Sequence, residues 1–458
     1  MFDLVIRDGR FVTPQGIIDG WLAVNDGRIA ALGEDSSPAA HETLDAQGNL
    51  ILPGGIDPHV HFRDPGFTAK EDFGTGSAAA AAGGVTTVFD MPNTHPAVLS
   101  TELFQAKQEN CESKSFVDFG LYAAADPTNL FELHALAEQG AIAFKVFLSD
   151  PAHPPPQAIL DNAVLWQTFK EIGDTGRPVC VHAEDQALIQ FFTERVRAAG
   201  RRDPLAHLDA RPTLCETTAI ARAILMAADT GAHLHVCHLS SGEGANLIRS
   251  AKLRGIRVTA ETGPQNLLLN STDYVRLGAR MKMKPPIRTA QDSAQLWQAI
   301  LDGTVDMLAT DHAPHTAEEK LKDDWMAAAS GFVGVETTLP LMLTQVNAKR
   351  LTLAQLNRLR SEMPARVFGL YPRKGVIQVG ADADLVLVDL VREWDIQEAD
   401  LHSRSPITPF GGWRVKGSVL ATLVRGRVVY REGQIVGAPQ GKPVRPNEVK
   451  HETLRAVA

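Results

Sequence analysis

The stretch Gly55-Ile56-Asp57-Pro58-His59-Val60-His61-Phe62-Arg63-Asp64 constrains the fold of this chain more than any other. Residues 55–61 form a short apolar run typical of a strand, in which alternate side chains point to the same face. His59 and His61 can therefore bind one metal ion if that face lines a pocket. Two histidines on a solvated strand face would give the same pattern, so the meaning of the pair depends on the rest of the chain.

The composition is that of a globular protein with a large core: 458 residues, 44% apolar and 22% charged. A net charge of −9, spread along the chain, does not favour a nucleic-acid partner. The four cysteines include no CxxC pair, which predicts a reduced, cytoplasmic protein. The N-terminus lacks a basic, apolar leader and no apolar run approaches ~18 residues, so we expect neither secretion nor a membrane span.

Short apolar runs, many ending in a polar or ionisable residue, alternate with Ala- and Leu-rich segments of helical spacing. This alternation favours a parallel sheet, and eight such units favour its closure into a (β/α)8 TIM barrel of the α/β class. The eight predicted strands are 55–61, 85–93, 116–123, 141–148, 178–184, 233–238, 256–261 and 305–311.

Both ends of the chain carry β-rich runs separated by turn signals such as Asp8-Gly9 and Arg425-Gly426. We predict that the two ends form one small β-sandwich with the barrel inserted between them. The predicted boundaries are 1–53 and 370–438 for the two parts of the sandwich, 54–369 for the barrel, and 439–458 for a polar, loose or partner-contacting tail.

Active-site residues of such barrels project from the carboxyl ends of the strands. A single histidine there is more often a structural group, and an aspartate can simply cap the next helix. Potential ligands at five strand ends are a stronger signal, and together they predict a metal site made of His59, His61, Lys145, His182, His238 and Asp311.

Lys145 lies between apolar neighbours in the run Ala143-Phe144-Lys145-Val146-Phe147. Burial disfavours its ammonium form, so the neutral amine becomes available to react with carbon dioxide. The resulting carbamate has two oxygens and a negative charge, enough to bridge two metal ions. A lysine that reaches solvent or pairs with an acid is the alternative.

This arrangement resembles the amidohydrolase superfamily, and within it the cyclic amidohydrolases: dihydroorotase, allantoinase, hydantoinase and dihydropyrimidinase. The likeness extends from the N-terminal strands to the segment Ser405-Pro406-Ile407-Thr408-Pro409. It implies two divalent ions, with zinc expected and manganese or cobalt able to substitute. The family pattern would place one ion on His59, His61 and Asp311, the other on His182 and His238, and carbamylated Lys145 across both.

The implied reaction is the opening of a cyclic amide or ureide by a hydroxide shared between the two ions. Asp311 would act as the general acid and base: it takes the proton during attack and returns it to the departing nitrogen. In the dihydroorotase pattern Arg63 and Asn93 hold the substrate carboxylate, and His315 also contacts the substrate. All three are present, so dihydroorotase, an enzyme of pyrimidine biosynthesis, is the first expectation. A salt bridge from Arg63 to Asp64 or Asp72, and a turn role for Asn93, are the structural alternatives.

Two departures from the dihydroorotase pattern keep other substrates open. Lys284 stands before Pro285-Pro286 where asparagine is usual, and Thr262-Gly263-Pro264-Gln265-Asn266 replaces the usual Thr-Pro-His-His. Lysine can bind an anion but cannot supply the paired donor and acceptor of an amide. Allantoinase, hydantoinase or dihydropyrimidinase activity, or hydrolysis of another anionic cyclic ureide, are therefore the alternatives.

The segment after Asp311 completes the expected site. Residues 318–332 have the composition of a mobile lid or of an ordinary surface helix. Gly331 lacks a side chain, which would allow its backbone to approach a planar ring. The resemblance also implies a homo-oligomer.

A non-catalytic role is the alternative from another class, because some dihydroorotase-like chains have lost metal ligands and serve as partners of aspartate transcarbamoylase. No residue of the expected ligand set is missing here, which favours the enzyme.

Overall fold

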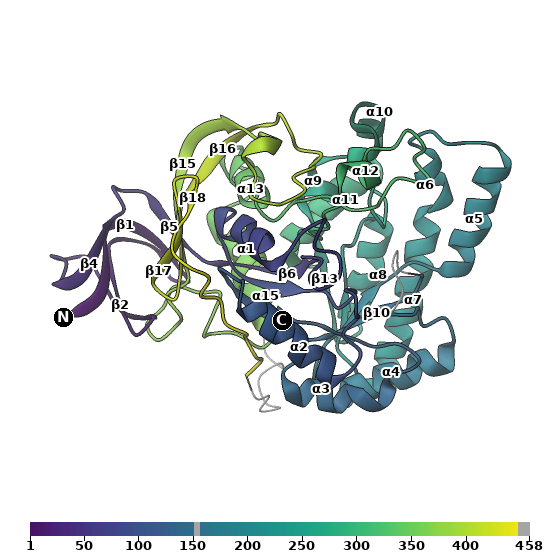
Figure 1. Ribbon diagram of the computed structural model, residues 1–458, viewed down its shortest axis with the longest axis horizontal. Helices are drawn as coiled ribbons and strands as arrows, with labels where there is room; N and C mark the ends of the chain where they lie inside the picture. Colours follow the sequence, from purple (N-terminus) through teal and green to yellow (C-terminus); the bar gives the residue numbers. More distant parts are fainter. Residues whose placement is uncertain (151–155, 448–458) are drawn as a thin grey trace.

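The protein is described by a computed structural model that covers residues 1–150 and 156–447 (Figure 1). Its central unit is a barrel whose strand pairings are all parallel. This confirms the predicted α/β barrel, in which β8 and β9 together take the third position. The strands are β6 (Gly55–Val60), β7 (Val85–Asp90), β8 (Asp118–Leu121), β9 (Ala123–Ala124), β10 (Phe144–Phe147), β11 (Val179–His182), β12 (Leu234–Val236), β13 (Val258–Thr262) and β14 (Met307–Leu308).

Two junctions close the barrel, because the strands form one ladder of three, β6-β7-β8, and one of six, β9 to β14. Between β8 and β9 only Tyr122 intervenes, and its N–H donates to the Asp90 carbonyl at 3.1 Å. On the other side, the His61 N–H donates to the His312 carbonyl at 2.7 Å. The second junction brings the end of the first barrel strand against the residues that follow the last one.

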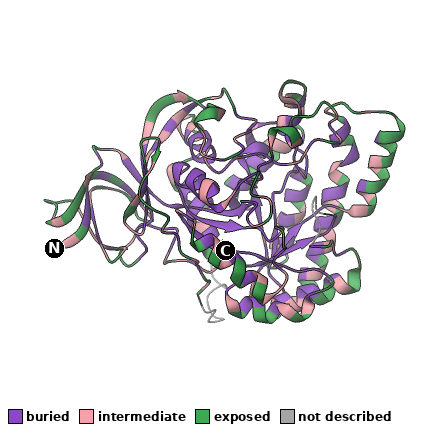
Figure 2. Cartoon of the chain, in the orientation of Figure 1, coloured by how far each residue is buried: buried purple, intermediate pink, exposed green. Residues whose placement is uncertain are grey.

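Helices surround the barrel, with buried inner faces and exposed outer faces (Figure 2). Several begin at an Asp, Ser or Thr whose side chain accepts a backbone N–H of the first turn. No helix in the described part of the chain is long and apolar enough to cross a membrane. The longer helices are α1 (Phe73–Ala82), α2 (Thr101–Glu112), α3 (Leu133–Gln139), α4 (Asn162–Asp174), α5 (Gln186–Ala198), α7 (Thr213–Thr230), α8 (Gly242–Leu253), α11 (Ala290–Leu301) and α13 (Thr338–Asn347). The shorter ones are α6 (Ala206–Ala210), α9 (Pro264–Leu268), α10 (Tyr274–Leu277), α12 (Ala317–Lys320), α14 (Leu353–Asn357) and α15 (Met363–Val367).

The two chain ends meet in a second unit beside the barrel (Figure 1). Its nine strands follow the order β18-β17-β16-β15-β5-β1-β2-β3, with β4 also paired to β1. A separate apolar core, which includes Phe11, Leu22, Leu385 and Leu423, lies inside this unit. The predicted β-sandwich formed by both chain ends is thereby confirmed. Its strands are β1 (Phe2–Thr13), β2 (Gly16–Asn25), β3 (Arg28–Gly33), β4 (Ala40–Asp45), β5 (Leu50–Pro53), β15 (Leu385–Asp395), β16 (Arg414–Val424), β17 (Arg427–Arg431) and β18 (Gln434–Ile435).

A buried charge cluster joins the sandwich to the barrel. Lys374 Nζ lies 2.8 Å from a carboxylate oxygen of Asp118, 2.6 Å from Asp384 and 3.1 Å from Asp382. Arg425 also pairs with Asp118. The three carboxylates are close enough to hold a cation, and the lysine ammonium already supplies that positive charge.

Part of the predicted tail is packed on the barrel rather than loose. The Phe119 N–H donates to the Lys442 carbonyl at 3.0 Å, and the Val444 N–H donates to the Phe119 carbonyl at 2.8 Å. Val444 is also buried in an apolar cluster with Phe368. Residues 442–444 thus supply backbone hydrogen-bond partners to the edge of β8. Residues 448–458 of the predicted tail lie outside the described residues.

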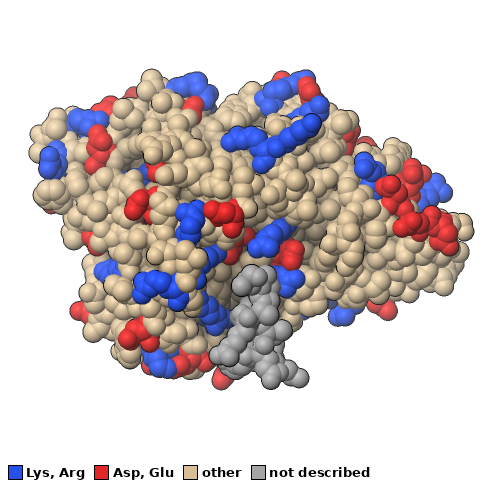
Figure 3. All heavy atoms as spheres, turned by 180° about the vertical axis from the view of Figure 1, so that it is seen from behind, with Lys and Arg blue, Asp and Glu red and all other residues tan. Residues whose placement is uncertain are grey.

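On the face of the molecule seen in Figure 3, charged side chains lie in small groups, several of which contain both acidic and basic residues, with uncharged surface between them.

Candidate metal centre and substrate pocket

One pocket at the carboxyl end of the barrel strands is lined by all eleven residues predicted for the site. The neighbouring chain segments add Phe147, Asp150, Ala313 and Ser330 to its wall. The predicted residues in the pocket are His59, His61, Arg63, Asn93, Lys145, His182, His238, Lys284, Asp311, His315 and Gly331. Their positions agree with the prediction, and the individual roles remain predictions.

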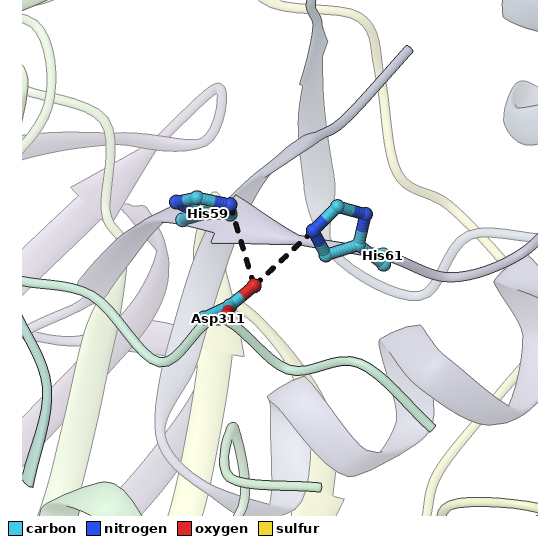
Figure 4. Close-up of side chains that lie close together, drawn as sticks. All are labelled: His59, His61 and Asp311. Atoms are coloured by element: carbon cyan, nitrogen blue, oxygen red, sulfur yellow. Dashed lines mark ion pairs between the residues drawn. The ribbon is translucent and has the colours of Figure 1, made fainter. Parts of the chain in front are cut away.

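The first group of potential ligands is His59, His61 and Asp311. Nε2 of His59 lies 3.4 Å from Oδ1 of Asp311, and Nε2 of His61 lies 3.2 Å from the same oxygen. Figure 4 shows both imidazoles, at the end of β6, turned toward the carboxylate on the segment after β14. One ligand atom from each residue lies within 4.8 Å of the other two, which is the spacing of a shared metal site.

The second group, His182 and His238, lies beside the first. Nδ1 of His182 is 3.0 Å from Nε2 of His238, and the centroids of the His238 and His59 rings are 5.2 Å apart. Burial lowers the pKa of His182 and of His238, which favours neutral imidazoles. Neutral imidazole is the form that binds a metal ion.

Hydrogen bonds on the outer side orient three of the four histidines. Each uses one ring nitrogen for an outer partner, so the other nitrogen presents its lone pair to the cluster. The outer contacts are His59 Nδ1 with Glu261 Oε1, His61 Nδ1 with Asn93 Oδ1 at 2.9 Å, and His182 Nε2 with Glu184 Oε2 at 3.0 Å.

Lys145 is the most unusual of the predicted ligands. Its side chain is 1% exposed, and Nζ has no hydrogen-bond partner among the described residues. Nδ1 of His238 is likewise buried without a described partner. A buried ammonium without a hydrogen-bond partner is costly in free energy. A carbamate on Lys145 together with bound metal ions would give partners to both the Lys145 side chain and Nδ1 of His238. The donor set therefore fits a metal centre.

Three residues of the site have left-handed backbone conformations that side chains other than glycine rarely adopt. The φ angles are +63° at Arg63, +36° at His238 and +50° at Asp311. Such strain persists only where the surrounding structure enforces it, and it is concentrated at functional sites. Here it turns three side chains into the pocket just beyond the strand ends.

Three buried acids behind the ligands were not predicted. Glu261 and Glu184 each accept from a histidine predicted to bind metal, as described above, and Asp57 accepts from Thr310 Oγ1 at 2.6 Å. Burial raises the pKa of Asp57 to about 6. Burial also raises the pKa of Glu261, but the facing His59 and His235 outweigh it and leave the pKa well below its ordinary value. The sequence places these three acids at strand ends or beside His59, which could have marked them as candidates. No local pattern, however, indicates which histidine or hydroxyl a given acid will face.

Arg63 reaches across the pocket to the segment after β14. Its Nε donates to the Pro314 carbonyl at 3.2 Å, and Nη2 lies 3.3 Å from His315 Nε2. The salt-bridge alternative for Arg63 is wrong, because Asp64 pairs with Lys114 and Asp72 with Arg404. Arg63 forms no ion pair with any residue in the described ranges 1–150 and 156–447.

Lys284 stands on the wall of the same pocket and is half-buried. Burial, helped by the nearby positive charge of Arg211, lowers the pKa of Lys284 to about 8. Among the described residues its ammonium has neither a hydrogen-bond nor an ion-pair partner, and the nearby Glu184 pairs with Arg211 instead.

The segment expected to be a lid is anchored. Lys282 Nζ donates to the Trp325 carbonyl at 2.6 Å and to that of Ala328 at 2.5 Å. Lys320 Nζ donates to the Lys282 carbonyl at 2.6 Å and to that of Ala329 at 3.1 Å. Two buried lysines therefore fix residues 325–329 beside the pocket.

Gly331 lines the pocket, but its N–H donates to the Lys282 carbonyl at 2.9 Å and is not free for a substrate. Its φ is +125°, and a Cβ atom at this position would lie 2.6 Å from the Ala313 carbonyl oxygen. Both the backbone conformation and the close approach explain why only glycine fits here.

A closed parallel barrel with histidines, an aspartate and an unpaired lysine at its carboxyl end defines the class of metal-dependent hydrolases. Comparison with known proteins is more specific. Residues 50–429 match the Amidohydrolase family, so the chain belongs to that family.

Relatives with three different names match nearly the whole chain. It is 39% identical to an allantoinase of Rubrobacter xylanophilus over 98% of this chain and 99% of the relative. It is 38% identical to a dihydroorotase of a Geobacillus species over 94% of this chain and 99% of the relative. The solved structure of an L-hydantoinase (dihydropyrimidinase) from Arthrobacter aurescens superposes with a TM-score of 0.94 and 36% identity, covering 97% of this chain and 100% of that one. The protein is thus a hydrolase related to enzymes that act on cyclic amides.

Proposed function

We propose that this protein opens a cyclic ureide that carries a carboxylate, with dihydroorotate and N-carbamoyl-aspartate as the first substrate–product pair. The single observation that carries the proposal is Arg63, a guanidinium in the pocket without an ion-pair partner among the described residues. A guanidinium binds a carboxylate through two parallel hydrogen bonds. Burial lowers the pKa of Arg63 to about 10, so the group stays charged at neutral pH.

The residues that would hold two divalent ions, zinc being expected, are His59, His61, Lys145 as a carbamate, His182, His238 and Asp311. Such ions, when bound, polarise a ring carbonyl and make water more acidic.

Asp311 is suited to move the proton. Burial raises its pKa, but the facing His59 and His61 outweigh that effect and hold the pKa well below its ordinary value. The carboxylate is therefore ionised and can accept a proton from the attacking water. Delivery of the same proton to the ring nitrogen completes the break of the carbon–nitrogen bond.

The chain's remaining pocket residues would orient the substrate. Arg63 would bind the carboxylate, and Asn93 would use its amide N–H groups because its Oδ1 already accepts from His61. His315 would donate from Nε2, which now contacts the Ser330 carbonyl at 3.0 Å.

A neutral ring, such as allantoin, hydantoin or dihydrouracil, is the second candidate. The specific observation in its favour is that the chain is about equally similar to an allantoinase and to a dihydroorotase. Lys284 adds a third possibility, a different anionic ureide, because its free ammonium replaces the asparagine of the dihydroorotase pattern.

The test is steady-state hydrolysis of dihydroorotate, allantoin, hydantoin and dihydrouracil, together with the metal content of the purified protein. We expect Arg63→Ala to lower kcat/KM for dihydroorotate by roughly 100-fold or more, the value of two hydrogen bonds to a charged group. Dihydrouracil lacks the carboxylate, so its much weaker turnover should change little. Arg276→Ala, on the exposed face of α10, is the control.

A preference for a neutral ring in the wild-type protein would reject dihydroorotate and leave the hydrolase assignment in place. Self-association and contact with aspartate transcarbamoylase stay predictions. A protein that holds no metal would favour the non-catalytic alternative.

A further inference from the structure

Glu261 is a fully buried carboxylate near the carboxyl end of the barrel strand β13. Its Oε1 accepts from Nδ1 of His59 and from the backbone N–H of His238, the latter at 3.1 Å. Its Oε2 lies 3.1 Å from Nε2 of His235. One side chain thus contacts one residue from each of the two groups of potential metal ligands.

The contacts of His235 indicate whether the oxygens of Glu261 accept or donate hydrogen bonds. Nδ1 of His235 lies 2.9 Å from Thr259 Oγ1, and that hydroxyl lies 2.9 Å from Nε2 of His233. A consistent set of donors runs through this column if His233 donates to Thr259, Thr259 to His235, and His235 to Glu261. Both oxygens of Glu261 then act only as acceptors.

The consequence for His59 is a defined tautomer. Because Nδ1 is used for Glu261, Nε2 is the nitrogen left for a metal ion, and it lies 3.4 Å from Asp311 Oδ1. Without the carboxylate the ring could rotate or shift its proton to Nε2, and either change would remove the lone pair from the cluster.

The consequence for His238 concerns the backbone. Its φ of +36° is strained for a residue with a side chain, and its N–H donates to Glu261. That hydrogen bond helps to retain the conformation that turns the His238 ring toward His182.

The interior of a parallel barrel is usually packed with branched apolar side chains. A buried carboxylate there is costly unless several donors face it. The three donors to Glu261 compensate that cost, and two of them belong to the predicted metal ligands.

We propose that Glu261 is a positioning residue that orients one ligand in each half of the metal centre: the side chain of His59 and the backbone of His238. This inference rests on the proposed function, because it takes the two histidines as metal ligands. His235 and Thr259 support Glu261 from behind and touch neither ligand group through a described hydrogen bond.

The test compares Glu261→Gln with Thr259→Val. Glutamine keeps the size of the side chain but removes its charge and one of its two acceptor oxygens, so the hydrogen bonds from His59 and His238 are weakened. Valine keeps the shape of threonine and breaks the column beyond His235, two steps from Glu261 and three from His59. Zn²⁺ affinity is measured by competition with a chelating indicator, and thermal unfolding is measured on metal-free protein.

We expect Glu261→Gln to weaken Zn²⁺ binding by about 10- to 100-fold, the range for partners that orient metal ligands. We also expect kcat to fall while KM changes less than about threefold, and excess Zn²⁺ to restore part of kcat. Thr259→Val should leave Zn²⁺ affinity within about threefold of wild type, although its metal-free stability also falls.

Equal Zn²⁺ affinity in wild type and Glu261→Gln would overturn the inference, as would equal losses in Glu261→Gln and Thr259→Val. A wild-type protein that binds Zn²⁺ but opens no ring would overturn the proposed substrate and leave the affinity comparison intact. A wild-type protein that binds no divalent ion would overturn both.

Discussion

Lys145 is the residue whose chemistry matters most to the proposed metal centre. Its Nζ is buried without a hydrogen-bond partner among the described residues, lies 5.4 Å from the centroid of the Phe147 ring, and shares the pocket with the four histidines. If a carbamate is its working form, the essential property is a carboxylate-like group at this position rather than the lysine itself.

Lys145→Ala should therefore abolish ring opening and reduce the bound metal. A short carboxylic acid such as acetate or propionate, present at high concentration, should restore part of both, because it can fill the space with two anionic oxygens. The rate is measured against acid concentration, with Lys170→Ala on the exposed side of α4 as a control. Metal content and activity that persist in Lys145→Ala without added acid would contradict the carbamate.

Lys284 gives the pocket a pH-dependent positive charge. Its pKa is lowered to about 8 by burial and by Arg211, so the ammonium is charged below that pH and neutral above it. Binding of an anionic ring should weaken as the pH rises through about 8, seen as an increase in KM. Lys284→Met should remove that step and leave a flatter KM profile, whereas a step of the same size in Lys284→Met would exclude this lysine as its source.

The residues of the site were predictable to different degrees. The predicted ligands follow from chemistry at strand ends, and all of them line the pocket. Glu261 also ends a predicted strand, but whether it faces a metal or a histidine depends on contacts between β6, β12 and β13 that no local pattern encodes.

At the scale of elements, the anchored segment 325–329 is a feature with a measurable role. Lys282 and Lys320 donate to five carbonyl contacts around it, and Trp325 is buried in an apolar cluster. The segment leads directly into Ser330 and Gly331 on the pocket wall.

Lys320→Met should leave the carbonyls of Lys282 and Ala329 without their donor, at a cost of about 1–3 kcal/mol. We expect faster amide hydrogen exchange in residues 321–331 and a higher KM for every ring, with unchanged metal content. Lys322→Met, a change of the same kind on the exposed part of the segment, is the matched control. Identical exchange in the two variants would show that Lys320 is not an anchor.

At two elements, the strands predicted from the sequence extend further than the observed strands. The runs 233–238 and 305–311 were expected to be strands throughout, but β12 ends at Val236 and β14 at Leu308. The residues beyond them include His238 and Asp311, whose left-handed backbones cannot continue a strand. Apolar periodicity locates a strand, whereas the departure from it is set by the geometry of the site.

At the scale of the whole molecule, the barrel and the sandwich share a buried ionic junction. Burial lowers the pKa of Lys374, but Asp118, Asp384 and Asp382 outweigh it and the net pKa is raised. The lysine is therefore charged at any pH near neutrality, and it compensates acids contributed by both units.

Lys374→Met should destabilise the protein by about 3–5 kcal/mol, because it leaves buried carboxylates without their cation. Urea unfolding measures the loss, and partial recovery is expected in Lys374→Met combined with Asp384→Asn. The sequence predicts both units and their division of the chain, but not this junction, since Asp118 lies 256 residues from Lys374 in sequence. A single Lys374→Met variant as stable as wild type would show that the junction is dispensable.

The pairing of β5 with β15 also determines when the sheet can form during synthesis of the chain. β5 pairs with β1 on one side, but on the other side Leu52 lies opposite Val386, so this second partner strand exists only after the whole barrel has been translated. At ribosomal rates of roughly 5–20 residues per second, that delay is on the order of 20 s to one minute. For this time the nascent chain exposes an unpaired, apolar edge, which is where premature association with another nascent chain would begin.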